Sequence, residues 1–270
     1  MPKISNALNE INTLDSLAHR QTPATALHPL AKLLVTLAYV ATLMSFGKYD
    51  LVSLVVMSLY IPWGFYFSQL SFTAALRRLR FILPLVCMVG LANPFFDEQV
   101  FTLGSITLKA GYISLLTLML KGALAVLASY LLIATTTIEQ ICYALRFLHV
   151  PKLMVTQILL TYRYLSLLLE QADTISQAYA LRAPQETGIR YRVWGSLAGQ
   201  LLLRSIDRAN ALYASMLLRG FNGEFFYRGP ITAWQQRDWH YLIILLLCFI
   251  LLRLLPMSQL FIHITGGHLQ

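Results

Sequence analysis

Two arginines with matching surroundings are the side chains in this sequence best suited to a specific interaction. Arg182 precedes Ala-Pro and Arg219 precedes Gly-Phe, and each stands near the C-terminal end of a segment that reads as a long helix. A guanidinium keeps its charge and five N–H donors in any setting, so such an arginine suits an apolar groove that ends in a carboxylate. Each could instead offset its own helix dipole, worth about 0.3 to 1 kcal/mol. Because the same arrangement occurs at two helix ends, we favour contact of both arginines with a partner protein. The flanking residues are Leu181, Ala183, Leu218 and Gly220.

The second of these segments carries a further pattern of charged and small residues. Polar and small side chains recur at spacings of three and four and share one helix face, and small residues also pair at four-residue spacing, which lets helix backbones approach closely. One interpretation is a solvated stripe over a tight helix contact. The other is two helices that cross closely at the cytoplasmic surface, each presenting an arginine. The residues concerned are Gly195, Gly199, Arg204, Arg208, Ala211 and Ser215.

The elements that hold these residues are predicted to be three helices within residues 135–237. The first opens with a capping-box pattern, Thr136 followed by Glu139. The second runs from Pro151 to the breaker Pro184, and the third covers about 192–219, where Gly220 stops it. At about 1.5 Å per residue, each of the two long helices spans roughly 40 to 50 Å. Such lengths exceed what a connecting loop requires.

The remainder of the chain has the composition of a membrane protein. Of the 270 residues, 57% are hydrophobic and 12% charged, and the mean hydropathy is +0.61. The net charge of +9 could indicate nucleic-acid binding, but a DNA- or RNA-binding protein would not need such long apolar runs. Positive segments on the cytoplasmic side of a membrane protein explain the charge better. We predict an all-α membrane protein with about five transmembrane helices and a cytoplasmic block holding two long crossing helices. The predicted spans are Leu30–Phe46, Leu51–Leu70, Phe81–Phe96, Ile106–Ala134 and Tyr241–Leu260.

The distribution of positive charge predicts one orientation. Arg77, Arg78 and Arg80 precede the third predicted span, and residues 135–237 hold 11 of the 21 Lys and Arg. Positive segments mark the cytoplasmic side, and both concentrations lie inside if the N-terminus is inside and the C-terminus outside. We therefore predict a multi-pass protein of the cytoplasmic (inner) membrane, without a cleavable signal. Its expected divisions are 1–29, cytoplasmic; 30–134, four spans; 135–237, cytoplasmic helices; and 238–270, the last span and outer tail.

Other chemistry is weakly represented. Neither the six histidines nor the three cysteines have metal-site spacing, so we expect no metal site and no cofactor. No GxxxxGK[ST] phosphate loop is present, so ATP hydrolysis would require another subunit. Lys121 falls inside the fourth predicted span. A charge at that depth marks either a functional site or a cation that snorkels or pairs within the helix bundle.

Several stretches together resemble one transporter family. They are INTLDSLAHR, LHPLAKLL, TTTIEQICYALRFLHVPKL, LLTYRYLSLLLEQADTISQAYALRA and SLAGQLLLRSIDRANALYASMLLRGFNGEF. The sequence is similar to the transmembrane T component of energy-coupling factor (ECF) transporters, in the CbiQ branch of cobalt and nickel uptake systems. One departure is His28-Pro29 where the family commonly has Asp-Pro, so the role of that aspartate does not transfer.

The resemblance implies a scaffold without catalytic activity. Its partners would be two ATP-binding cassette ATPase subunits, a substrate-binding membrane S component similar to CbiM or NikM, and the lipid bilayer. Arg182 and Arg219 would dock the two long helices into grooves of the ATPases. The competing interpretation is a self-sufficient secondary transporter, which would favour inverted repeats and several intramembrane ionisable groups. The sequence shows no such repeat, and it does not choose among cobalt, nickel and other cargo.

Overall fold

The computed structural model separates the chain into two compact units, which we treat individually. The long-helix unit comprises residues 1–18 and 137–231, and the apolar unit comprises residues 19–136 and 232–270. The structure describes residues 13, 15–18, 20, 22, 24–48, 50–91, 100–103, 106–186, 188–223, 234–254 and 268–269. Nearly all regular structure in these ranges is helical, as the predicted fold class requires, with three short strands in addition.

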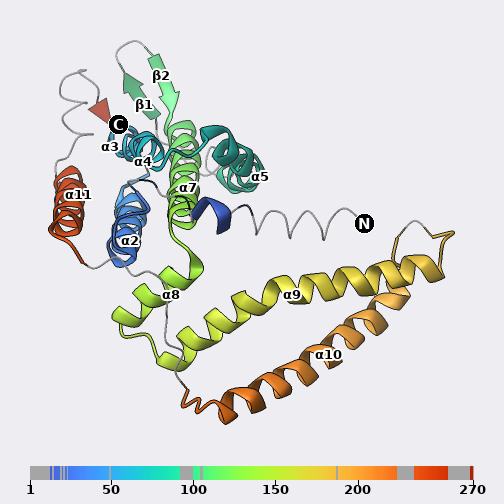
Figure 1. The fold of residues 1–270 in the computed structure, drawn as a ribbon. Helices are drawn as coiled ribbons and strands as arrows, with labels where there is room; N and C mark the ends of the chain where they lie inside the picture. Colours follow the sequence, from blue (N-terminus) through green and yellow to red (C-terminus); the bar gives the residue numbers. More distant parts are fainter. Residues whose placement is uncertain are drawn as a thin grey trace. The chain divides into compact units, whose positions relative to one another are not determined.

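The apolar unit is built around its longest helix, α7 (Figure 1). Helices α2, α3, α4 and α5 all pack against α7, and α11 packs against α2 and α3. The bounds of these helices are Pro29–Ser45 for α2, Leu51–Ser58 for α3, Tyr60–Ser68 for α4, Phe72–Gly90 for α5, Ala110–Thr135 for α7 and Gln236–Leu254 for α11.

An aromatic cluster joins three of these helices in the core. The ring of Tyr39 on α2 lies 4.7 Å from that of Tyr60 on α4 and 5.4 Å from that of Phe249 on α11, measured between centroids. The Tyr39 hydroxyl donates to the Met57 carbonyl oxygen at 3.2 Å, so its polar atom is satisfied although the residue is fully buried. Aromatic packing of this kind fixes helices that lack polar side chains to hold them.

The second predicted span is one apolar stretch interrupted at Leu59, where α3 ends and α4 begins. Pro62 explains the interruption, because it has no N–H to donate to the carbonyl of Ser58 one turn earlier. Taken together, Leu51–Ser68 is still long and apolar enough to cross a bilayer.

Two helical stretches in the described part of the chain meet the length and composition expected of a membrane span, Leu51–Ser68 and Gly111–Thr135. Of the apolar window of the latter, 33% is buried within the protein, and most of the remaining residues are half-buried, with Tyr112, Leu116 and Ile133 exposed. Helix α2 is apolar but shorter. Because residues 92–96 and 255–260 lie outside the described residues, the count of five spans stays a prediction.

Three short strands form an antiparallel sheet with the order β2-β1-β3. Their bounds are Val100–Leu103 for β1, Ile106–Lys109 for β2 and His268–Leu269 for β3. The prediction that a helix begins at Ile106 was therefore wrong by four residues. Ile106-Thr-Leu-Lys109 pairs with β1, and its β-branched residues suit an extended backbone.

The long-helix unit contains three helices, α8 (Ile138–Phe147), α9 (Lys152–Arg182) and α10 (Tyr191–Leu218). Helix α9 packs against both of the others. Helix α8 begins with a capping box, but its members are Thr137 and Gln140, one residue later than the sequence pattern predicts. The shift occurs because Gln140 Oε1 accepts from the backbone N–H of Thr137, while the Thr137 hydroxyl oxygen accepts from the backbone N–H of Gln140.

Candidate functional site

The arginine at the end of α9 is fully accessible. Arg182 is the last helical residue, and the Leu181 side chain beside it is 84% exposed. The N–H of Ala183 donates to the Tyr179 carbonyl oxygen at 3.0 Å and closes the helix. Among the residues that the structure describes, no carboxylate lies within ion-pair distance of the Arg182 guanidinium. The end of α9 therefore presents a leucine and a cation together.

The arginine at the end of α10 sits in a Schellman motif. The N–H of Phe221 donates to the Met216 carbonyl and the N–H of Gly220 to the Leu217 carbonyl, both at 3.0 Å. Gly220 adopts φ +78°, a left-handed conformation that favours glycine. This turn leaves Arg219 exposed at the C-cap, again without an ion-pair partner in the described ranges. Leu218 before it is 91% exposed.

The two arginines lie at opposite ends of the α9–α10 pair. The helices run in opposite directions, joined through residues 183–190 (Figure 1). The Thr156 hydroxyl near the start of α9 donates to the Gly223 carbonyl just after α10, at 3.4 Å. Arg219 therefore stands near the start of α9, whereas Arg182 stands 26 residues further along it, about 40 Å away at 1.5 Å per residue. A single carboxylate therefore cannot form an ion pair with both arginines.

Helix α10 has no buried residue. A helix that packs against a single neighbour normally keeps a polar outer surface, yet α10 exposes many large apolar side chains together with its arginines. Large apolar side chains exposed in such numbers favour an interaction site. The large apolar residues that α10 exposes are Tyr191, Trp194, Leu202, Leu203, Ile206, Tyr213, Leu217 and Leu218, and the exposed residues of the predicted polar stripe are Arg204, Arg208, Ala211 and Ser215.

The glycines of α10 do not make the close helix contact that their spacing predicts. A Cβ atom built on Gly195 or Gly199 meets no other atom within 4 Å. The close crossing is therefore not made at these positions within this chain, because this part of α10 faces open space. The face is available to another chain, and the role of these glycines in a crossing stays a prediction.

Lys121, in the middle of α7, pairs within the helix bundle. Its ammonium donates to the carbonyl oxygen of Phe46, the C-cap of α2, at 2.6 Å. Arg253 of α11 reaches the same helix end, where its Nε donates to the Ser45 hydroxyl at 2.9 Å. Cations at a helix C-terminus satisfy carbonyls that have no intrahelical donor. Of the two interpretations of Lys121, the structure favours internal pairing.

A buried polar cluster at the other end of α2 was not anticipated. We call Lys32, His28, Thr135 and Asp238 the inner cluster. The Lys32 ammonium, 5% exposed as a residue, donates to the Thr135 carbonyl oxygen at 2.8 Å. Asp238 is fully buried and accepts from the backbone N–H of His28 at 3.1 Å and of Gln235 at 2.9 Å. Its carboxylate also interacts electrostatically with Lys32, so the cluster ties together α2, α7 and α11.

His28 holds the start of α2 with its ring. The Nδ1 atom accepts from the Leu30 N–H at 3.2 Å, and the ring lies 4.8 Å from that of Trp234. An Nδ1 acceptor requires the neutral ring. Burial lowers the pKa of His28 from its usual value of 6.5, Asp238 opposes that shift and Lys32 adds to it. The imidazole thus caps α2 in its uncharged form.

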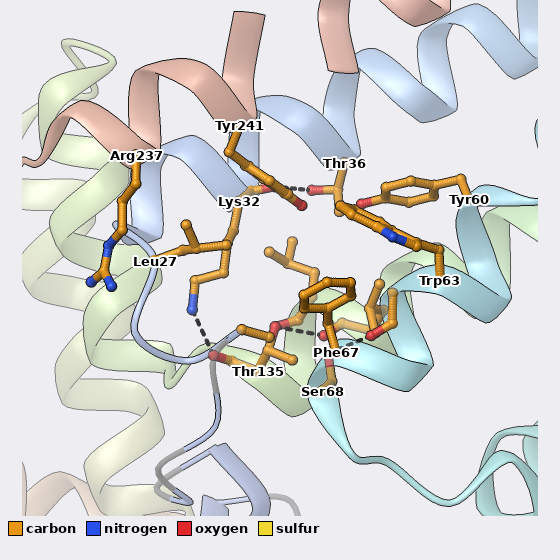
Figure 2. Close-up of a pocket in the computed structure, with 14 residues that line it drawn as sticks. Leu27, Lys32, Thr36, Tyr60, Trp63, Phe67, Ser68, Thr135, Arg237 and Tyr241 are labelled. Atoms are coloured by element: carbon orange, nitrogen blue, oxygen red, sulfur yellow. Dashed lines mark hydrogen bonds between the residues drawn. The ribbon is translucent and has the colours of Figure 1, made fainter. Parts of the chain in front are cut away.

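A cavity of about 300 Å³ adjoins the inner cluster. Figure 2 shows the Lys32 side chain reaching from α2 toward Thr135, with Arg237 of α11 on the other side of Leu27. Aromatic rings and small polar groups form the remaining wall. The other labelled lining residues are Thr36, Tyr60, Trp63, Phe67, Ser68 and Tyr241.

Comparison with known proteins identifies the family. The model of the CbiQ family, described as cobalt transport protein, matches residues 20–228, which is most of the chain. The chain belongs to the CbiQ family. The family is described as one of transport proteins. The match extends from before α2 to beyond α10, so Arg182 and Arg219 lie inside it, whereas Arg237 and Asp238 follow it.

Two curated relatives show what the similarity covers. The nickel permease LarQ of Lactiplantibacillus plantarum is 33% identical over 128 residues, which are 47% of this chain and 47% of that protein. The cobalt transport protein CbiQ of Salmonella typhimurium is 29% identical over 120 residues, 43% of this chain and 52% of that protein. The chain thus matches about half the length of each relative.

Sequence reasoning missed the inner cluster of this CbiQ-family chain. The one available signal was Asp238, an acidic residue directly before the apolar run of α11. Nothing local linked it to His28, which lies 210 residues earlier. Among the described residues, no three His, Cys, Asp or Glu side chains gather as they would to hold a metal ion.

Proposed function

We propose that this chain is the transmembrane energy-coupling scaffold of an ECF-type ABC importer. It transmits the ATP-driven motion of two cytoplasmic ATPase subunits to a separate substrate-binding membrane subunit. Cobalt or nickel ions are the proposed cargo, on the strength of the relatives' names. The observation that carries the proposal is the α9–α10 pair, which exposes apolar side chains along α10 and one arginine at each end.

The separation of the arginines suggests how force would enter. Each end offers a leucine and a guanidinium, a combination that fits an apolar groove closed by a carboxylate. Because the ends stand about 40 Å apart, each would occupy its own ATPase subunit. Two ATPases that approach or separate on binding and hydrolysing ATP would then pull on both ends of a stiff antiparallel pair. The two helices would carry that motion to the membrane helices.

The orientation follows from charge and from the family. Residues 135–237, which hold 11 of the 21 Lys and Arg, would face the ATPases in the cytoplasm. The N-terminus would lie inside, and the chain would cross the inner membrane several times. The end of the apolar unit where α2 starts and α7 stops would then be its cytoplasmic end.

Charge reversal at the two arginines tests this function. Arg182→Glu or Arg219→Glu should leave membrane insertion intact, abolish ATP-driven uptake of cobalt or nickel, and release the ATPases during purification. Truncating one partner of a buried charge pair costs roughly 2 to 5 kcal/mol, and reversal costs more. Arg163→Glu is the control, because Arg163 is exposed on α9 away from both ends. Normal uptake by either end variant would contradict the proposal.

The same preparation separates this function from that of a secondary transporter. Purification in mild detergent, with mass identification of bound subunits, should recover an ATP-binding protein and a second membrane subunit. Uptake by vesicles should stop when the ATPases are removed. Ion uptake by this chain alone, driven by an ion gradient, would establish the secondary transporter instead.

A further inference from the structure

The cavity beside the inner cluster lies where four helix ends meet. Helix α2 begins one residue after His28, α4 ends at Ser68, α7 ends at Thr135 and α11 begins at Gln236. Its lining comes from these ends, from the segment before α2 and from the body of α4, including Tyr60 and Trp63. Helices that span a bilayer end near its surface, so the cavity sits at headgroup level rather than at the membrane centre. In the orientation proposed above, on which this placement rests, that surface is the cytoplasmic one.

The charged groups that line this cavity are both cations. Among the described residues that line it, Lys32 and Arg237 are the only Lys, Arg, Asp or Glu. Asp238 acts on Lys32 electrostatically but does not line the cavity, and its two oxygens already accept backbone N–H groups. Lys32 uses one of its three donors on Thr135. The cavity therefore carries a net positive charge and spare donors.

A second, apolar groove continues from the cavity. It has a volume of about 510 Å³ and shares Tyr60, Trp63 and Tyr241 with the first. From Tyr241 it follows α11 to Leu252, a rise of about 16 Å toward the membrane interior. Lys, Arg, Asp and Glu are absent from its lining within the described residues. A cationic chamber at headgroup depth thus leads into an apolar groove at acyl-chain depth.

We propose that these two spaces bind one anionic phospholipid of the inner leaflet. Its phosphate would enter the cavity that Lys32 and Arg237 both line and would accept from either cation, and one acyl chain would follow α11 along the apolar groove. Basic pockets between membrane helices on the cytoplasmic side have the chemistry that binds acidic headgroups. Trp63 and Tyr241 would lie where amphipathic rings favour the membrane–water interface. The lipid would bridge α2, α4 and α11 beside the inner cluster.

Lipid retention by the purified full-length chain tests the proposal. The chain is exchanged into detergent containing equal amounts of dioleoyl phosphatidylglycerol and dioleoyl phosphatidylcholine, and bound lipid is counted by native mass spectrometry. Each cation close to an acidic headgroup is worth about fivefold in binding. We expect phosphatidylglycerol to be preferred at least about fivefold by the wild type, and Arg237→Gln to lose about that factor.

Two further variants make the result specific. Arg253→Gln is the matched control, because Arg253 is a cation on the same helix whose partners lie at the opposite end of α2. It should retain the preference. Leu245→Trp narrows the apolar groove without changing charge, and it should reduce retention of both lipids. Lys32→Met should lower the preference as Arg237→Gln does.

Three results would overturn the proposal. The first is equal retention of the two lipids by the wild type. The second is an unchanged preference in Arg237→Gln. The third is displacement of phosphatidylglycerol by millimolar inorganic phosphate, which would show a site for a free anion. The measurement needs no ATPase, so loss of coupling in the Arg182 and Arg219 variants neither supports nor contradicts it.

Discussion

Asp238→Asn is the substitution with the most direct consequence for the apolar unit. The side chain keeps its shape but loses its charge, and one of its two oxygens becomes an NH2 group that cannot accept. Either His28 or Gln235 then keeps a buried backbone N–H without an acceptor, at about 1.5 to 3 kcal/mol for a bond to a charged group. Lys32 also loses the carboxylate that compensates its buried charge. Breaking a buried pair from one side costs about 3 to 5 kcal/mol in total.

A double-mutant cycle separates the charge effect from the hydrogen bonds. Thermal unfolding is followed in detergent for Asp238→Asn, Lys32→Met and the double variant. At about 2 to 4 °C per kcal/mol, Asp238→Asn should lower the midpoint by about 6 to 20 °C. The double variant should be less destabilised than the sum of the two, by about 0.5 to 3 kcal/mol, because no charge remains stranded. Asp207→Asn, at an exposed position of α10, is the control and should have no effect.

Two outcomes would refute this reasoning. If Asp238→Asn leaves the unfolding midpoint at its wild-type value, the carboxylate does not hold the helix ends together. If the effects of the Lys32 and Asp238 substitutions simply add, the two charges are not coupled, and the hydrogen bonds to His28 and Gln235 account for all the stability.

Two further predictions concern a titrating cap and a helix end. Burial lowers the pKa of His28 in the folded chain below its usual value of 6.5. As pH falls below 6.5, His28 therefore takes up a proton in the unfolded chain before it does so in the folded chain. The free energy of unfolding should decrease over the pH range between 6.5 and the lowered pKa. Thermal unfolding at about pH 7.5 and about pH 5.5 should show a larger loss for the wild type than for His28→Asn, which caps without titrating; equal losses would contradict this. Gly220→Ala forces a side chain into φ +78° and should lower the free energy of opening at the end of α10 by about 1 to 2 kcal/mol, measured by hydrogen exchange at Phe221. Gly195→Ala places its side chain in open space and should stabilise α10 by up to about 1 kcal/mol. Equal exchange in the two variants would count against the turn.

The long helices were predictable because their limits are set locally. Pro184 ends the predicted second helix and Gly220 the third, and the structure ends α9 at Arg182 and α10 at Leu218. Each signal acts through the backbone of its own residue, through a fixed φ or a tolerated left-handed turn. The exposure of the two arginines followed from these same ends.

The remaining features depend on contacts that no local pattern encodes. The inner cluster joins Asp238 to His28 across 210 residues, and Lys32 to Thr135 across 103. Residues Ile106–Lys109 read equally well as the start of an apolar helix, and only pairing with β1 decides for a strand. The spacing of Gly195 and Gly199 predicted a close helix contact, whereas a Cβ atom at either position meets no other atom of this chain within 4 Å.

The absence of buried residues in α10 has a consequence for biosynthesis. A helix that its own chain does not cover draws little stability from tertiary packing and opens more readily than the aromatic core around Tyr39. Newly made copies in excess of the proposed partner subunits would expose the apolar, arginine-bearing surface of α10 to proteases and chaperones. If the proposed ATPase subunits cover α10, cellular levels of this protein should follow their supply, with surplus copies degraded.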